Sequence, residues 1–233
     1  MQKNFLKTLK IIAKFRESLD APVDIYGPQA IASKKEGDKV YRYQVLIALM
    51  LSSQTKDQIT AKTISILQKY GLTPENINNT SVEKINELIK HSGFHNLKSK
   101  YIKNTTKIIL DEYDSDIPKT LEELIKLPGV GYKMAILAMN IAWKINCGIS
   151  VDTHVHKVSN RLGWIKTNKA EKTRKELEDW IPKEYWASIN PLLVGFGQQV
   201  CLPRNPKCSS CPVNKYCAYN LNNKKVDNIS YEV

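Results

Sequence analysis

Lys133 is the residue of this sequence best placed for nucleophilic chemistry. It follows the motif Leu127-Pro128-Gly129-Val130-Gly131 and lies in the first turn of the next helical pattern. The positive end of a helix dipole disfavours the charged form of a lysine at that position, and a lysine must be neutral to attack carbon. Lys133 is therefore a candidate nucleophile. The alternative is a lysine that simply pairs with a phosphate group.

The motif before Lys133 predicts a phosphate-binding corner. Pro128 ends the preceding helix, and the two glycines permit positive φ angles and a close approach of the backbone. The corner thus presents the N–H groups of Gly129, Val130 and Gly131 at a helix start, where the dipole also attracts anions. A DNA phosphate fits there without any base being read. The alternative is a tight corner between two helices that binds nothing.

Asp152 opens another helical pattern within Val151-Asp152-Thr153-His154. An aspartate at this position is a natural N-cap, because its carboxylate accepts the unpaired N–H groups of the first turn. Capping keeps the carboxylate charged and in place. If the two helix starts converge, Asp152 can therefore accept a proton from Lys133 or stabilise positive charge on a sugar.

Four of the five cysteines form the pattern Cys201-x6-Cys208-x2-Cys211-x5-Cys217, whereas Cys147 stands alone and is interpreted as a small buried side chain. Clustered thiols of this kind predict a metal site. Cysteine ligands suit zinc and iron–sulfur clusters alike. Zinc sites often have paired CxxC motifs, and only one CxxC occurs here. The spacing favours an iron–sulfur cluster and leaves zinc open.

Charge and composition narrow the class of partner. Thirty-five Lys and Arg against 23 Asp and Glu give a net charge of +12, with 42% hydrophobic residues. The excess of cations predicts a polyanionic partner such as nucleic acid. No apolar run approaches the roughly 18 residues that a membrane-spanning helix needs, so no membrane association is expected.

Apolar residues recur at helical spacing along most of the chain, which predicts an all-α fold. A first helix is expected around Leu6 to Leu19, and residues 22–38 are predicted to be a loop because they are rich in proline and glycine. Pro191 is expected to break or kink the helix over residues 184–200. The other predicted helices cover residues 44–52, 57–70, 82–89, 98–111, 121–127, 132–144, 153–162 and 173–180.

Taken together, these motifs resemble the helix-hairpin-helix DNA glycosylases, and most closely the eukaryotic branch of the endonuclease III family. The resemblance extends from about residue 21 to Cys217. Besides the hairpin, Asp152 and the cysteines, it is carried by three stretches: Leu49-Met50-Leu51-Ser52-Ser53-Gln54-Thr55-Lys56-Asp57, Gly131-Tyr132-Lys133-Met134-Ala135 and Leu193-Val194-Gly195-Phe196-Gly197-Gln198-Gln199.

The resemblance implies the helix-hairpin-helix DNA glycosylase fold with two helical domains. A six-helix barrel with the hairpin is expected over residues 36–146. Residues 1–35 and 147–233 are expected to form the second domain, in which Cys201, Cys208, Cys211 and Cys217 bind a 4Fe–4S cluster. Lys133 and Asp152 would then face each other across one cleft.

The family's activity implies a bifunctional DNA glycosylase and AP lyase of base excision repair that excises oxidised pyrimidines. By the same resemblance, Lys133 attacks C1′ of the damaged nucleotide and forms a Schiff base, and β-elimination then cuts the strand on the 3′ side. Asp152 matches the catalytic aspartate. Gln54 would fill the gap left by the extruded nucleotide, and Phe94 would act as an apolar wedge, with a buried loop anchor as the alternative for Phe94.

The implied partner is double-stranded DNA with damaged bases or abasic sites, bound by a monomer in the nucleus and also in mitochondria. Two alternatives remain. One is an adenine-removing glycosylase of the same fold, although such enzymes carry a residue other than lysine at the position of Lys133. The other is a helix-hairpin-helix protein that binds DNA without chemistry.

Overall fold

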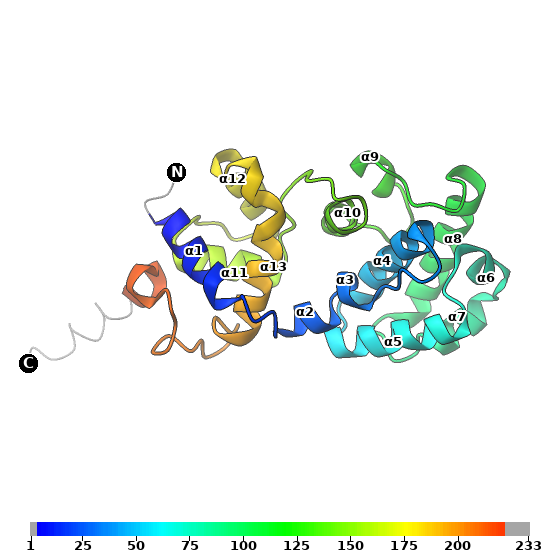
Figure 1. Ribbon diagram of the computed structural model, residues 1–233, viewed down its shortest axis with the longest axis horizontal. Coiled ribbons are helices and arrows are strands. Elements are labelled where there is room, and N and C mark those ends of the chain that lie inside the picture. The colour runs from blue at the N-terminus through cyan, green and yellow to red at the C-terminus, as the bar shows by residue number, and fades with distance from the viewer. Residues whose placement is uncertain (1–3, 222–233) are drawn as a thin grey trace, which may run out of the picture. The chain divides into compact units, whose positions relative to one another are not determined.

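The computed structural model describes residues 4–221, which form helices, turns and loops and contain no β-strand (Figure 1). The all-α prediction is therefore confirmed. The chain divides into two compact units, Asp24–Cys147 and Met1–Val23 with Gly148–Val233. They are called here the hairpin unit and the cluster unit. The limits expected from the family, at residues 36–146, stay a prediction.

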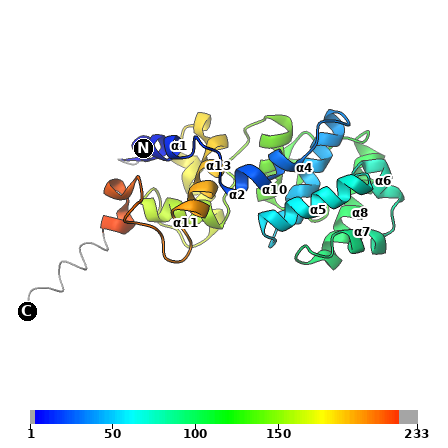
Figure 2. The same ribbon diagram turned by 60° about the horizontal axis from the view of Figure 1, so that its bottom comes forward.

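Helix α4 (Asp38–Ser52) is the centre of the hairpin unit. Every residue from Tyr43 to Leu51 is buried, as expected for a helix that is apolar on all sides. It contacts α3 (Pro28–Ile31), α5 (Asp57–Tyr70), α8 (His95–Glu112) and α10 (Tyr132–Ala138), as Figures 1 and 2 show. The hairpin elements are thus built around one buried helix.

The remaining helices of the hairpin unit are short. Helices α6 (Pro74–Asn79) and α7 (Val82–Leu88) pack on α8, while α9 (Leu121–Leu124) packs on α10. Thr73 and Ser81 cap α6 and α7 through their hydroxyl groups. Helix α10 continues directly into a π-helix, Met139–Trp143, where a single α-helix over residues 132–144 was expected.

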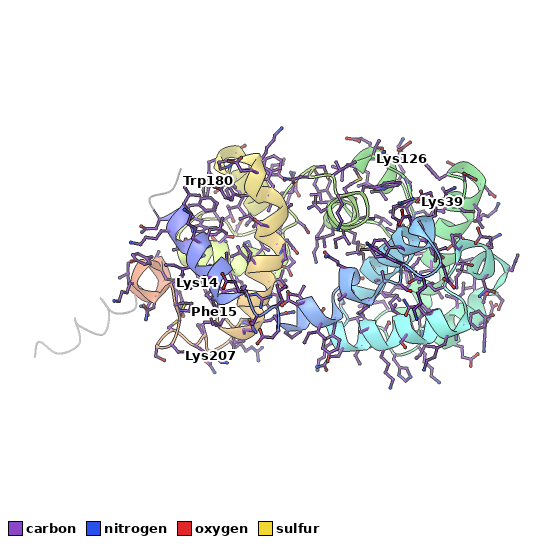
Figure 3. The ribbon with its side chains drawn as sticks, viewed as in Figure 1. Lys14, Phe15, Lys39, Lys126, Trp180 and Lys207 are labelled. Carbon is purple, nitrogen blue, oxygen red and sulfur yellow. The ribbon has the colours of Figure 1, made fainter. Side chains whose placement is uncertain are left out.

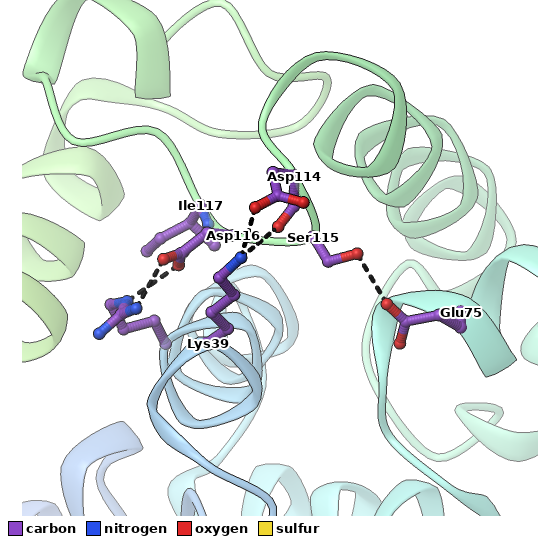
Figure 4. A network of polar contacts seen from close by, with 7 residues as sticks. Lys39, Glu75, Asp114, Ser115, Asp116 and Ile117 are labelled. Atoms are coloured by element: carbon purple, nitrogen blue, oxygen red, sulfur yellow. Dashed lines mark hydrogen bonds and ion pairs between the residues drawn. The ribbon is translucent and has the colours of Figure 1, made fainter.

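A polar network fixes the loop that leads from α8 to α9 (Figure 4). Lys39 pairs with Asp114 at 2.7 Å, and Arg42 binds the carboxylate of Asp116 through two hydrogen bonds of 2.6 and 2.9 Å. Ser115 donates to Glu75 at 2.7 Å. The paired Arg42–Asp116 contact has the geometry that gives the strongest ion pairs. The loop before the hairpin is therefore held against α4 and α6.

The cluster unit is built on α1 (Phe5–Phe15), α11 (Thr153–Leu162), α12 (Ala170–Trp180) and α13 (Lys183–Gln199), followed by a 3-10 turn at Asn214–Tyr216. Helix α13 contacts both α1 and α11. The fully buried Phe5, Trp164 and Phe196 anchor its core, and Phe5 meets the ring of Trp164 edge-on at 4.9 Å. This core supports the start of α11, where Asp152 lies.

Two expectations about proline were wrong. Residues 22–38 are not one loop, because α2 (Pro22–Tyr26) and α3 both begin at a proline. Proline suits the first helical position, where its missing N–H has no partner to lose. Helix α13 also runs through Pro191 without ending. Within residues 4–221, no helix is long and apolar enough to cross a membrane.

Candidate functional site

The glycine corner is packed tightly against α8. Gly129 has φ +79°, and a Cβ atom there would lie 2.6 Å from the ring of Tyr101. Thr105 donates a hydrogen bond to the carbonyl of Pro128 at 2.9 Å, and the Val130 N–H donates to the Leu127 carbonyl at 3.1 Å. The corner therefore requires glycine at 129 and has little freedom to move relative to α8.

Lys133 lies in the first turn of α10 and its side chain is exposed. Gly131 is the N-cap of this helix and is exposed, with open space where a Cβ would stand. Val130 is buried, so only its backbone is available to a ligand. The nearby Lys126 side chain is also exposed (Figure 3). The sequence motif thus yields a corner with accessible backbone and cations around it, which suits an anion.

Asp152 is the N-cap of α11, as predicted. Its Oδ1 atom accepts the N–H of Val155 at 2.8 Å. The strand of chain before it is fixed at two points: the Ile149 N–H donates to Glu178 at 2.8 Å, and Asn190 donates to the Ser150 carbonyl at 2.9 Å. Because Lys133 belongs to the hairpin unit and Asp152 to the cluster unit, their convergence across a cleft stays a prediction.

Gln54 and Phe94 lie on two neighbouring corners of the hairpin unit. Gln54 follows the end of α4, Phe94 precedes α8, and both adopt left-handed φ angles of 51° and 57°. A Cβ on Gly93 would lie 2.5 Å from the Gln54 carbonyl oxygen, so the two corners are in direct contact. Both side chains are exposed, Phe94 to 62%. Phe94 is therefore not a buried loop anchor.

Lys98 was not singled out from the sequence, yet it is a buried lysine beside these corners. Only 5% of its surface is exposed, and burial lowers the pKa of its amine to about 8. In the sequence it is one of many lysines in a helical pattern. Its burial arises from the packing of α8 on the end of α4, which no local signal predicts.

The four C-terminal cysteines line one cavity of the cluster unit. Its other walls are largely apolar and include Leu162, Phe196, Val200 and Val213. In the described part of the chain, no three His, Cys, Asp or Glu side chains converge to hold a single metal ion. A zinc ion needs such convergence, with sulfurs about 2.3 Å from one centre. Thiols spread around a larger cavity instead fit the separate corners of an iron–sulfur cluster.

The chemistry of the thiols agrees with a positively charged occupant. Burial raises the pKa of Cys211 to about 11 and also raises the pKa values of Cys201 and Cys217. Iron ligation requires thiolates, so the metal must displace these protons when it binds. Arg161 donates to the sulfur of Cys201 at 3.4 Å and to the carbonyl of Leu202 at 2.7 Å. The cavity thus carries a built-in cation beside a ligand sulfur.

Comparison with protein families gives two matches. Residues 47–183 match the HhH-GPD superfamily base excision DNA repair proteins, and residues 201–217 match the iron-sulfur binding domain of endonuclease III. The chain is 50% identical to endonuclease III-like protein 1 of Gallus gallus, over 92% of this chain and 77% of that protein. It is 39% identical to the endonuclease III homolog of Encephalitozoon cuniculi, covering 88% and 90% of the two chains.

Solved structures agree. A trapped covalent intermediate of endonuclease III with DNA has a TM-score of 0.83 and 27% identity, covering 96% of this chain and 99% of that chain. A non-covalent endonuclease III–DNA complex has a TM-score of 0.81 and 28% identity, covering 97% and 99%.

Substitution of Gly129 by alanine should destabilise the protein because the new Cβ would meet the Tyr101 ring at a positive φ angle. We expect a loss of about 1–3 kcal/mol in the free energy of unfolding, measured by urea denaturation. Gly131→Ala is the matched control, since position 131 has open space and a negative φ angle of −88°. Equal stability of the two variants would contradict the described packing.

Substitution of Cys211 by serine should reduce the iron bound to the purified protein, because serine removes one thiolate from the cavity. Iron and acid-labile sulfide per chain are the quantities to measure. Cys147→Ser is the control and should retain the iron content of the unmodified protein, since Cys147 does not line this cavity. Unchanged iron in Cys211→Ser, or zinc in place of iron in the unmodified protein, would refute the assignment.

Proposed function

This chain belongs to the HhH-GPD superfamily of base excision DNA repair proteins, in its endonuclease III family, and from that membership we propose that it excises oxidised pyrimidines from duplex DNA. It is a DNA-binding DNA glycosylase with AP lyase activity that carries a 4Fe–4S cluster. The family, fold class, enzyme class and cofactor expected from the sequence are confirmed. The lesion and the residues that act on it are the content of the proposal.

We propose Lys133 as the nucleophile, and its exposed place in the first turn of α10 is the observation that carries this assignment. The neutral amine forms a bond to C1′ of the extruded nucleotide while the bond from C1′ to the base breaks and the base leaves. Ring opening gives a Schiff base between Lys133 and the sugar. Loss of a proton from C2′ then expels the 3′ phosphate by β-elimination. The covalent intermediate of the related endonuclease III supports this route.

Asp152 is proposed to act beside Lys133 once DNA is bound. The carboxylate is held at the start of α11 by the Val155 N–H and cannot turn away without losing that hydrogen bond. In this position it can take a proton from the Lys133 ammonium or stabilise positive charge that develops on the sugar. The role requires the hairpin and cluster units to bring these two residues together on DNA.

The DNA contacts are proposed to come from the two sets of corners in the hairpin unit. The N–H groups at Gly129, Val130 and Gly131 would bind a backbone phosphate and fix the register of the enzyme on the duplex. Gln54 would occupy the space of the extruded nucleotide, and Phe94 would separate the neighbouring bases. Their exposure supports both roles.

Two other functions are less well supported. An adenine-removing glycosylase of the same fold would share the hairpin and the cluster, but the lysine at position 133 favours lyase chemistry. A non-catalytic DNA-binding protein would have no use for a lysine and an aspartate at these two helix starts. We further propose that the protein acts as a monomer in the nucleus and also in mitochondria. Its similar proteins in Gallus gallus and Schizosaccharomyces pombe, both eukaryotes, support this.

Borohydride trapping tests the nucleophile. The unmodified protein should become covalently linked to duplex DNA that carries thymine glycol or an abasic site, because reduction fixes the Schiff base. It should release no undamaged adenine from a mispair. Lys133→Gln should give no linked product, while the matched control Lys126→Gln, also an exposed lysine near the corner, should still give it. Trapping by Lys133→Gln would move the nucleophile elsewhere, and its absence in the unmodified protein would exclude lyase chemistry.

Replacement of Asp152 by asparagine should slow base removal by about 100-fold or more, the range usual for a positioned acid–base group. Asparagine can still cap α11 through its side-chain oxygen, so the thermal unfolding midpoint should change little. Single-turnover release of the damaged base measures the effect. A rate equal to that of the unmodified protein would leave Asp152 as a helix cap without a catalytic role.

A further inference from the structure

The two corners that carry Gln54 and Phe94 need something to hold them, because both residues adopt left-handed backbone conformations that favour glycine. Helix α4 ends at Ser52, and its last carbonyl groups have no partner within the helix. Glycine after the helix end is the usual solution. Here Gln54 stands at that point, so the carbonyl groups must be satisfied in another way.

Lys98 provides this. Its Nζ atom donates hydrogen bonds to the carbonyls of Leu51 and Ser53, both at 2.7 Å, and to the hydroxyl of Thr55 at 3.1 Å. A protonated amine has three donors, and all three are used on this short segment. The positive charge also lies at the negative end of the α4 dipole. Lys98 therefore closes the end of α4 and fixes the turn that presents Gln54.

The same contact reaches the Phe94 corner. The Thr55 hydroxyl, which accepts from Lys98, also accepts the Gly93 N–H at 3.1 Å. Gly93 has no side chain, which lets its backbone approach the Gln54 carbonyl. The chain of contacts runs from Lys98 through Thr55 to Gly93, the residue before Phe94. One buried amine thus connects both corners.

We infer that Lys98 is a positioning residue for base extrusion: it locks the Gln54 and Phe94 corners into one rigid element that enters the duplex. This inference rests on the proposed function, which gives Gln54 and Phe94 their roles in DNA. Lys98 itself touches neither the substrate nor the reacting atoms. Its contribution is to keep two exposed side chains at a fixed separation, so that no energy of DNA binding is spent on ordering them.

This role predicts different effects on two substrates. A damaged base must be unstacked before Lys133 can reach its sugar, and the wedge has to support that step. An abasic site has no base to unstack, so its cleavage depends much less on the corners. A merely structural role for Lys98 would lower both activities together.

The test uses Lys98→Met, which keeps the apolar stem but removes the three donors. Its matched control is Lys103→Met, because Lys103 lies on the same helix and donates to the carbonyls of Asn78 and Thr80 in another loop. Single-turnover removal of thymine glycol should fall by about 10- to 100-fold in Lys98→Met, while cleavage at an abasic site stays within about threefold. Lys103→Met should show no such split. Fluorescence of 2-aminopurine placed beside the lesion should report reduced unstacking in Lys98→Met alone.

Equal losses on both substrates, or the same pattern in both variants, would overturn the inference. If Lys98→Met does not fold, Thr55→Val removes the hydroxyl that joins the two corners and should give the same split. An unmodified protein that neither removes the lesion nor is trapped on an abasic site would refute the proposed function itself. That outcome is separate from an active unmodified protein whose Lys98→Met variant behaves like Lys103→Met.

Discussion

The close packing of the glycine corner against α8 is the contact on which the hairpin unit depends. The Tyr101 ring leaves no room for a side chain at position 129, and Thr105 holds the carbonyl of Pro128. Lys98, Tyr101 and Thr105 follow each other at three- and four-residue spacing, which places them on one face of the helix. The corner before Lys133 and the corners of Gln54 and Phe94 are thus fixed to the same rigid surface. Nucleophile and wedge keep a constant separation in the absence of DNA.

Helix α11 has the corresponding place in the cluster unit. Asp152 caps its first turn, and Arg161 in its last turn donates to the carbonyls of Leu202 and Pro203 at 2.7 and 3.1 Å. The loop that holds the iron–sulfur cluster and the proposed catalytic carboxylate therefore lie at opposite ends of one ten-residue helix. Because α11 also packs along α13, the cluster fastens residues 201–217 to the helix that presents Asp152. Its effect on base removal is then structural, without any direct part in the bond-breaking steps.

Local patterns predicted the helices well and the contacts between them poorly. The helices expected at residues 57–70 and 153–162 match α5 and α11 at both ends, because their apolar spacing and capping residues are local. The π-helix after α10 and the uninterrupted α13 were not foreseen, since tertiary packing decides both. Among the site residues, Lys133 and Asp152 could be proposed because each belongs to a contiguous motif. Lys98 could not, because its burial depends on three acceptors that lie more than 40 residues earlier in the chain.

Gln54 and Phe94 also break the rules that govern helix ends. Glycine is usual in the left-handed position after a helix, and serine or aspartate before one, because these residues satisfy the backbone at least cost. A glutamine and a phenylalanine in left-handed conformations each cost roughly 1–2 kcal/mol instead. Neither side chain recovers this by packing, as both are exposed. Residues that strain the backbone and gain no burial are retained for what their side chains contact outside the protein. For a basic chain that extrudes a nucleotide, that contact is the interior of the opened duplex.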